Sequence, residues 1–154
     1  IEFRISTIPG SIPGPLAKIA SGGELSRISL AIQVITARTS RTPTLIFDEV
    51  DVGVGGATAE VVGSLLRKLG DHAQIICVTH LPQVAAQGHQ HYVVAKSTTK
   101  KSATTTVVQL TEEEKVDEIA RMLGGVEKTD LSLAHAEAML LGVESNQSET
   151  DPSE

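Results

Sequence analysis

The chain has 154 residues, of which 40% are hydrophobic, so it is long enough to bury one ordinary core and too short for two. Its formal net charge of -6 has the wrong sign for a surface that wraps the phosphates of a duplex. With two Phe, one Tyr and no Trp, it also offers few aromatic platforms for single-stranded bases, so direct nucleic-acid binding by this chain is disfavoured.

The single cysteine, Cys77, lies within an apolar run, where a small buried side chain is a better interpretation than a redox or metal site. No charged-then-apolar leader opens the chain. No apolar run approaches the ~18 residues that a membrane span requires. We therefore expect a soluble, cytoplasmic protein that has no membrane contact.

The first half of the chain alternates strand and helix patterns. Residues 1–7 alternate apolar and polar side chains, as in a half-buried strand, and a Pro/Gly-rich loop follows. From Ser21 onward apolar residues recur at helical intervals until Pro43 blocks continuation. Residues 44–47 predict a buried strand that ends on two acids, residues 57–69 a helix, and residues 73–78 a second buried strand. Such alternation indicates parallel crossover units with helices on both faces of a sheet.

The second half predicts a hairpin and two helices. Residues 91–97 and 104–111 have the pattern of two antiparallel strands at the sheet edge. Residues 112–123 predict a helix with acids in its first turn, and residues 131–141 predict a last helix. The closing stretch is acidic and almost without apolar residues, so we expect one domain over residues 1–142 and a disordered acidic tail over residues 143–154.

The first candidate for chemistry is the motif Ser21, Gly22, Gly23 and Glu24, directly before the predicted helix. As local structure it is a capping box, in which the Ser21 hydroxyl and the Glu24 carboxylate bond first-turn amides. Paired glycines also let backbone N–H groups approach an anion, and a helix N-terminus adds partial positive charge. The motif therefore suits either a purely structural cap or a phosphate.

The second candidate is Asp48 and Glu49, two acids at the end of an apolar strand. Strand alternation points their side chains in opposite directions, so they suit separate roles. One acid can hold Mg²⁺ through water while the other orients or deprotonates an attacking water. The alternative is a strand that simply ends on acids at solvent.

The third candidate is His80, which follows the second buried strand after Thr79. A histidine there can hydrogen-bond a terminal phosphate or an attacking water, or it can serve as an ordinary loop histidine. The other histidines lack comparable placement, and we expect them to be structural or exposed; they are His72, His89, His91 and His135. Only His89 and His91 have a spacing that weakly resembles that of metal ligands.

Taken in this order, the three motifs resemble the ATP-binding cassette superfamily, in which they are the signature motif, the Walker B strand and the switch histidine. Within it, the segments KIASGGELSR, LIFDEVDVGVGG, CVTHLPQVAA and EIARMLGG resemble the RecN family. RecN proteins act in bacterial DNA double-strand-break repair and are related to the structural-maintenance-of-chromosomes (SMC) ATPases. The resemblance covers about residues 1–142.

The resemblance implies an α/β, P-loop NTPase-like three-layer sandwich, of which this chain is the C-terminal half. Asp48 would help to bind Mg²⁺ through water, Glu49 would be the catalytic base and His80 would contact the terminal phosphate. Ser21–Glu24 would close on ATP held by a second head in an ATP-sandwiched dimer. Where the family has a further Asp after the Walker B strand, this chain has Gly55.

No G-x-x-x-x-G-K-[ST] phosphate loop (Walker A) occurs in the chain. In the RecN-like arrangement that loop belongs to an N-terminal head lobe beyond a long coiled coil, so this lobe alone is expected to be inactive. DNA would be met through the full protein, in the cytoplasm at the bacterial nucleoid. Two alternatives stay open: half of another SMC-like or cassette ATPase, and a non-catalytic adaptor that kept the fold.

Overall fold

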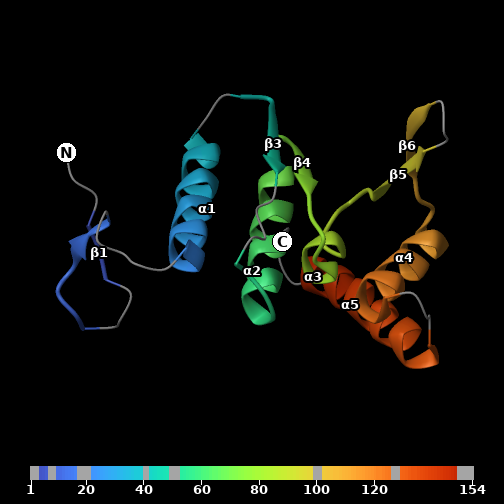
Figure 1. Cartoon of the computed structure of the whole chain (residues 1–154). Helices are drawn as coiled ribbons and strands as arrows, with labels where there is room; N and C mark the ends of the chain where they lie inside the picture. Colours follow the sequence, from blue (N-terminus) through green and yellow to red (C-terminus); the bar gives the residue numbers. More distant parts are fainter. Residues whose placement is uncertain are drawn as a thin grey trace.

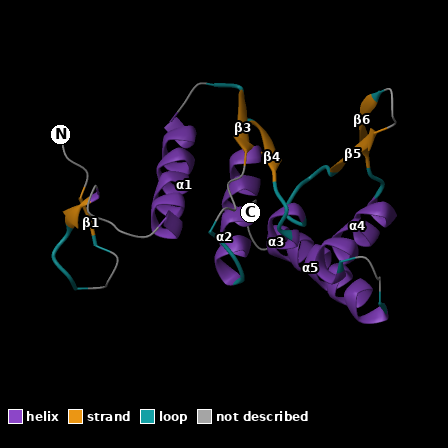
Figure 2. Ribbon diagram, viewed as in Figure 1, coloured by secondary structure: helices purple, strands orange, loops and turns teal. Residues whose placement is uncertain are grey.

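The computed structural model describes residues 4–6, 10–16, 22–39, 42–48, 53–98, 102–125 and 129–148 (Figures 1 and 2). In chain order the elements are β1 (Arg4–Ile5), β2 (Gly14–Pro15), α1 (Gly22–Thr39), β3 (Thr44–Asp48), α2 (Ala57–Gly70), β4 (Gln74–Val78), α3 (Pro82–Ala85), β5 (Tyr92–Thr98), β6 (Ala103–Gln109), α4 (Glu112–Gly124) and α5 (Asp130–Ser148). The predicted alternation of helices and strands from α1 to α4 is confirmed.

Parallel pairing of β3 with β4 forms the centre of the fold. Leu45 lies opposite Ile75, and Phe47 lies opposite Cys77. Because strand side chains alternate, these four residues share one face, and there they pack against α1, α2 and α3. The buried residues of this first core are Leu30, Val34, Phe47, Ala59, Val62, Leu66, Leu69 and Val84. Cys77 is half-buried against this core rather than fully buried.

The opposite face of the β3–β4 pair is apolar and exposed. Ile46, Ile76 and Val78 leave 69%, 44% and 54% of their surface accessible. The predicted α/β class is confirmed, but within the described residues helices cover only one of the two sheet faces. Large apolar side chains gathered on one face normally mark an interaction surface. This face is therefore the place where a further layer can be added.

Strands β5 and β6 form the predicted antiparallel hairpin, with Tyr92 opposite Gln109 and Thr98 opposite Ala103. Contrary to prediction, the hairpin is not an edge of the β3–β4 sheet but a separate two-stranded sheet. Figure 1 shows it extending away from the rest of the chain, above α4. The hairpin can form alone because its hydrogen bonds join two strands that are neighbours in the chain. To join the parallel sheet, β5 or β6 would have to lie beside β3 or β4, and neither does.

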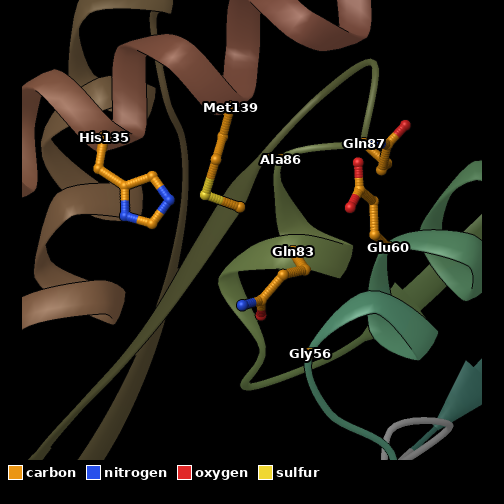
Figure 3. A pocket seen from close by; sticks show the side chains of 7 residues that line it. All are labelled: Gly56, Glu60, Gln83, Ala86, Gln87, His135 and Met139. Carbon is orange, nitrogen blue, oxygen red and sulfur yellow. The ribbon is translucent and has the colours of Figure 1, made fainter.

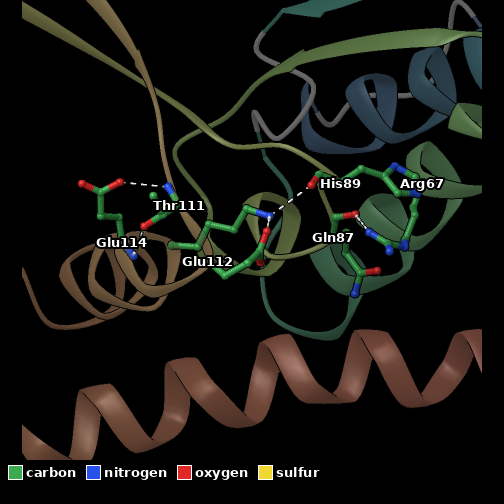
Figure 4. Close-up of polar contacts among 7 residues, drawn as sticks. Arg67, Gln87, His89, Thr111, Glu112 and Glu114 are labelled. Atoms are coloured by element: carbon green, nitrogen blue, oxygen red, sulfur yellow. Dashed lines mark hydrogen bonds and ion pairs between the residues drawn. The ribbon is translucent and has the colours of Figure 1, made fainter.

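Helices α4 and α5 pack on each other and form a second core with the end of α3. Its buried residues are Ala86, Ile119, Ala120 and Ala136. A capping box starts α4: Thr111 Oγ1 accepts from the Glu114 amide, and the Glu114 carboxylate accepts from the Thr111 amide (Figure 4). This cap fixes the point at which the chain leaves β6 and enters α4.

Helix α5 is longer than the sequence predicted. It continues to Ser148, so residues 143–148, which were assigned to the disordered tail, are helical. Val143 is buried, which anchors the turn at which the helix was expected to stop. Each further helical residue then adds a backbone hydrogen bond without a new nucleation cost. Residues 149–154 lie outside the described part.

None of the helices in the described part of the chain combines the length and the apolar character that crossing a bilayer would demand.

Candidate functional site

Asp48 and His80 lie at the same edge of the parallel sheet. Asp48 is the last residue of β3 and is exposed, and its Cα partner in the ladder is Val78, the last residue of β4. His80 follows two residues later and is also exposed. Because neighbouring strands lie about 4.8 Å apart, the two strand ends bring these motifs together. Glu49, the expected catalytic base, lies outside the described residues.

A tight turn carries His80. The hydroxyl oxygen of Thr79 accepts a hydrogen bond from the backbone N–H of Leu81 at 3.0 Å, which bends the chain around His80. Leu81 is extended, with φ -93° and ψ 123°, and caps α3. Pro82 follows as a buried first helical residue, where its fixed φ suits the helix. The direction of the chain is thus set on both sides of His80.

The predicted signature motif falls at the start of α1. Ser21 lies outside the described residues, and Gly22 begins the helix with Gly23 and Glu24 in its first turn. The predicted Ser21–Glu24 capping box is therefore not tested by the described side chains. Figure 1 shows α1 rising toward the loop that leads into β3, so the first turn of α1 and the carboxyl ends of β3 and β4 face the same side.

The glycine segment after β3 leads into α2. Gly53 and Gly56 have φ values of 74° and 54°, a left-handed backbone that only glycine adopts freely. Gly55 differs in its φ, which lies outside this positive range, and a Cβ added to it would meet nothing within 4 Å. Neither space nor backbone conformation therefore requires glycine at the position where the cassette family has Asp.

A pocket of about 230 Å³ opens between the start of α2, α3 and the middle of α5. Its lining residues are Gly56, Glu60, Gln83, Ala86, Gln87, His135 and Met139. In Figure 3, Met139 extends from α5 toward Gln83 on α3. The sequence did not indicate this pocket because its walls come from three elements that are far apart in the chain. His135 was expected to be structural or exposed, and it is exposed at the pocket wall.

Two cations hold the segment that links the two cores. The Arg67 guanidinium on α2 donates to the Gln87 carbonyl oxygen at 2.6 Å. Lys115 on α4 is buried and donates to the His89 carbonyl oxygen at 3.0 Å and to the Glu112 carboxylate at 2.7 Å (Figure 4). These bonds tie the chain between α3 and β5 to helices on both sides.

The two histidines of this linking segment favour the neutral state. Burial, followed by the nearby charges of Arg67 and Lys115, lowers the pKa of His89, and Asp71 partly opposes the shift. Burial is also the largest cause that lowers the pKa of His91, against the opposing charge of Glu118. Among the described residues, no cluster of three or more metal-binding side chains includes this pair.

No family model matches the chain. The DNA repair protein RecN of Vibrio cholerae is 55% identical to it over 141 residues, which is 92% of this chain and 26% of that protein. RecN of Haemophilus influenzae is 56% identical over 140 residues, 91% of this chain and 25% of that protein. RecN of Bacillus subtilis is 45% identical over 140 residues, 91% of this chain and 24% of that protein. The chain thus spans about a quarter of the length of these relatives.

Solved structures of SMC proteins share the fold. One, described as "Structural biochemistry of ATP-driven dimerization and DNA stimulated activation of SMC ATPases", matches with a TM-score of 0.59 and 19% identity, over 77% of this chain and 70% of that chain. The Smc head domain with a coiled coil and joint from Pyrococcus yayanosii matches with a TM-score of 0.57 and 23% identity, over 71% of this chain and 20% of that chain. The predicted P-loop NTPase-like head fold is therefore confirmed.

The resemblance predicted from the motifs is confirmed by these relatives, and in sequence this chain corresponds to the C-terminal part of RecN proteins, with the fold of an SMC head.

Proposed function

We propose that this chain is the C-terminal lobe of an ATP-hydrolysing head in a RecN-type DNA repair protein. The observation that carries the proposal is the exposed apolar face of Ile46, Ile76 and Val78, on the same strands that end at Asp48 and lead to His80. If nothing covered this face, the lobe would expose a large apolar surface beside its own proposed catalytic motifs. A second lobe packed on this face removes that surface from water.

The partner lobe in this proposal is the N-terminal part of the same polypeptide. Two facts support it: the chain contains no Walker A loop, and it spans only about a quarter of its RecN relatives. The other three quarters of those relatives have ample length for a lobe that supplies the phosphate loop and for a coiled coil. In this proposal the present lobe extends to the end of α5 at Ser148, somewhat beyond the boundary at residue 142 that the sequence suggested.

The strand-end residues fit ATP bound with Mg²⁺. Asp48 presents an exposed carboxylate at the sheet edge, and a carboxylate together with water and phosphate oxygens is the donor set that Mg²⁺ prefers. When bound, Mg²⁺ would neutralise charge on the phosphates. Glu49 takes the proton of the attacking water, and His80 donates a hydrogen bond to the terminal phosphate.

The start of α1 completes the site across a second head. Gly22 and Gly23 lie in the first turn of α1, and the lack of a side chain suits the close approach of an anion to backbone N–H groups, where the helix dipole favours negative charge. In the proposal, Ser21 and Glu24 join them in contacting ATP held by the other head. DNA binds the complete protein rather than this acidic lobe, at the nucleoid in the bacterial cytoplasm.

The test uses the complete polypeptide and the variant Glu49→Gln. We expect ATP to bind as before, kcat to fall about 10²- to 10⁴-fold through loss of the general base, and ATP-bound head pairs to accumulate. ATP affinity, turnover and molar mass with ATP give the three readouts. Glu113→Gln, which changes an exposed acid at the start of α4, is the matched control.

Unchanged turnover in Glu49→Gln would contradict the catalytic role of Glu49. No ATP turnover by the parental complete polypeptide would favour a non-catalytic adaptor. Robust turnover by this lobe alone would contradict the composite head, because the lobe lacks the Walker A loop that would stabilise the phosphates.

A further inference from the structure

We propose that Thr79 is a positioning residue for His80: its hydroxyl closes the turn that aims the imidazole at the terminal phosphate. The inference rests on the proposed function, because it assigns Thr79 a role in that same site. It is carried by the hydrogen bond from the Leu81 amide to Thr79 Oγ1 at 3.0 Å, in which His80 is the enclosed residue.

The chain is anchored immediately before this turn. Val78 is the last ladder residue of β4 and lies opposite Asp48, so the strand ends are held in register. Up to this point the backbone hydrogen bonds of the parallel ladder determine the path of the chain. Val78 ends the described ladder, and from there the Thr79 hydroxyl provides a local hydrogen bond that orients the next residues.

The chain is anchored again immediately after the turn, because α3 is pressed against α2. Gly63 on α2 makes this approach possible: a Cβ there would lie 2.7 Å from Gln87 Cγ and 3.1 Å from the Gln83 carbonyl oxygen. Arg67 then bonds the Gln87 carbonyl oxygen. With α3 held by α2, Pro82 has a fixed position as its first residue.

Three residues, Thr79, His80 and Leu81, therefore span two fixed points. The Thr79 hydroxyl bonds the amide two residues on, which makes one backbone conformation of His80 more stable than the others. Loss of the acceptor leaves the half-buried Leu81 amide without this partner and allows the peptide units around His80 to rotate. Small displacements of a catalytic group have large effects on rate.

The substitutions that test the inference separate shape from hydrogen bonding. Thr79→Val keeps the branched shape and removes the acceptor, while Thr79→Ser keeps the acceptor. Thr36→Val is the matched control, since the Thr36 hydroxyl on α1 also hydrogen-bonds the backbone, here as a donor to the carbonyl oxygens of Ile32 at 2.7 Å and Gln33 at 3.1 Å. Each is made in the complete polypeptide and compared for ATP turnover.

We expect Thr79→Val to lower kcat about 10- to 100-fold with a smaller change in KM. Thr79→Ser retains most of the turnover, and Thr36→Val turns over like the parent. Hydrogen exchange at the Leu81 amide is faster in Thr79→Val than in Thr79→Ser. If Thr79 acted in folding alone, Thr79→Val would lower the amount of folded protein without changing the kcat of the folded fraction. A fall in kcat that serine restores therefore distinguishes positioning from folding.

A double-mutant cycle with His80→Ala decides whether Thr79 acts through His80. If it does, Thr79→Val has almost no further effect once His80 is alanine. An equal loss in both backgrounds overturns the inference, as does parental turnover in Thr79→Val while His80→Ala is impaired. Parental turnover in His80→Ala overturns the proposed role of His80 as well. Should Thr79→Val not fold, Thr79→Ala takes its place in the same cycle.

Discussion

Arg67 on α2 donates a hydrogen bond of 2.6 Å to the backbone carbonyl oxygen of Gln87, the residue with which the turn after α3 ends. This bond, together with the close contact of Gly63 with Gln87, joins α2 to the chain that follows His80. The chain that follows His80 is thus held to α2. Loss of this hydrogen bond should therefore loosen the packing of the chain after His80 against α2.

Replacing Arg67 by Met should destabilise the complete protein by about 1.5–3 kcal/mol, the range for a hydrogen bond to a charged donor. The methionine keeps the apolar stem and leaves the Gln87 carbonyl oxygen without its partner. Urea unfolding measures the difference. Lys68→Met, at the exposed neighbouring position, serves as the control. Equal losses in the two variants would show that the bond to Gln87 contributes nothing.

Gly63 and Gly142 should respond in opposite directions to alanine. At Gly63 a methyl group would meet Gln87 Cγ at 2.7 Å and the Gln83 carbonyl oxygen at 3.1 Å, so α3 must move away from α2. At Gly142, on α5, nothing lies within 4 Å. We expect Gly142→Ala to gain up to about 1 kcal/mol from helix propensity and Gly63→Ala to lose stability. Thermal unfolding compares them, and a gain at Gly63 would refute the close contact.

Ile76→Ser probes the exposed sheet face in the complete polypeptide. If a second lobe covers this face, the substitution removes a buried side chain and costs about 1.5–3 kcal/mol. Ile12→Ser is the reference, because Ile12 is 88% exposed in this structure. The free energies of unfolding in urea are compared. A cost at Ile76 no larger than that at Ile12 would mean that the face stays exposed and that the partner lobe lies elsewhere.

Acidification should destabilise the linking segment through His91. Because burial lowers its pKa in the folded state, the unfolded chain binds this proton more readily. The stabilising effect is complete above the ordinary value of 6.5 and is lost as pH falls through 6.5 toward the lower folded-state pKa. Melting temperatures between about pH 7.5 and 5.5 should therefore decline, and less steeply in His91→Gln. Parallel pH profiles for the two proteins would exclude His91 as a source of the decline.

Local patterns in the sequence were sufficient to predict the elements and the motifs. Helical spacing after Ser21 and apolar strands before Asp48 and after Ala73 predicted α1, β3 and β4 closely. The hairpin was predictable for the same reason, since β5 and β6 are neighbours in the chain. Parallel strands then placed Asp48 and His80 at one edge, because carboxyl ends of parallel strands meet there.

Tertiary structure decided what depends on contacts between distant segments. Which sheet the hairpin joins, which face of β3 and β4 the helices cover and how far α5 continues are set by packing that no local pattern reports. The contact of Gly63 with Gln87 is of the same kind. The hydrogen bond from the Leu81 amide to Thr79 is local, but its effect on His80 depends on α3 being held by α2. Sequence alone thus predicted which residues carry the candidate chemistry, because motif and period are local. Only the folded chain determined how they are held, because that depends on the shape of neighbouring surfaces.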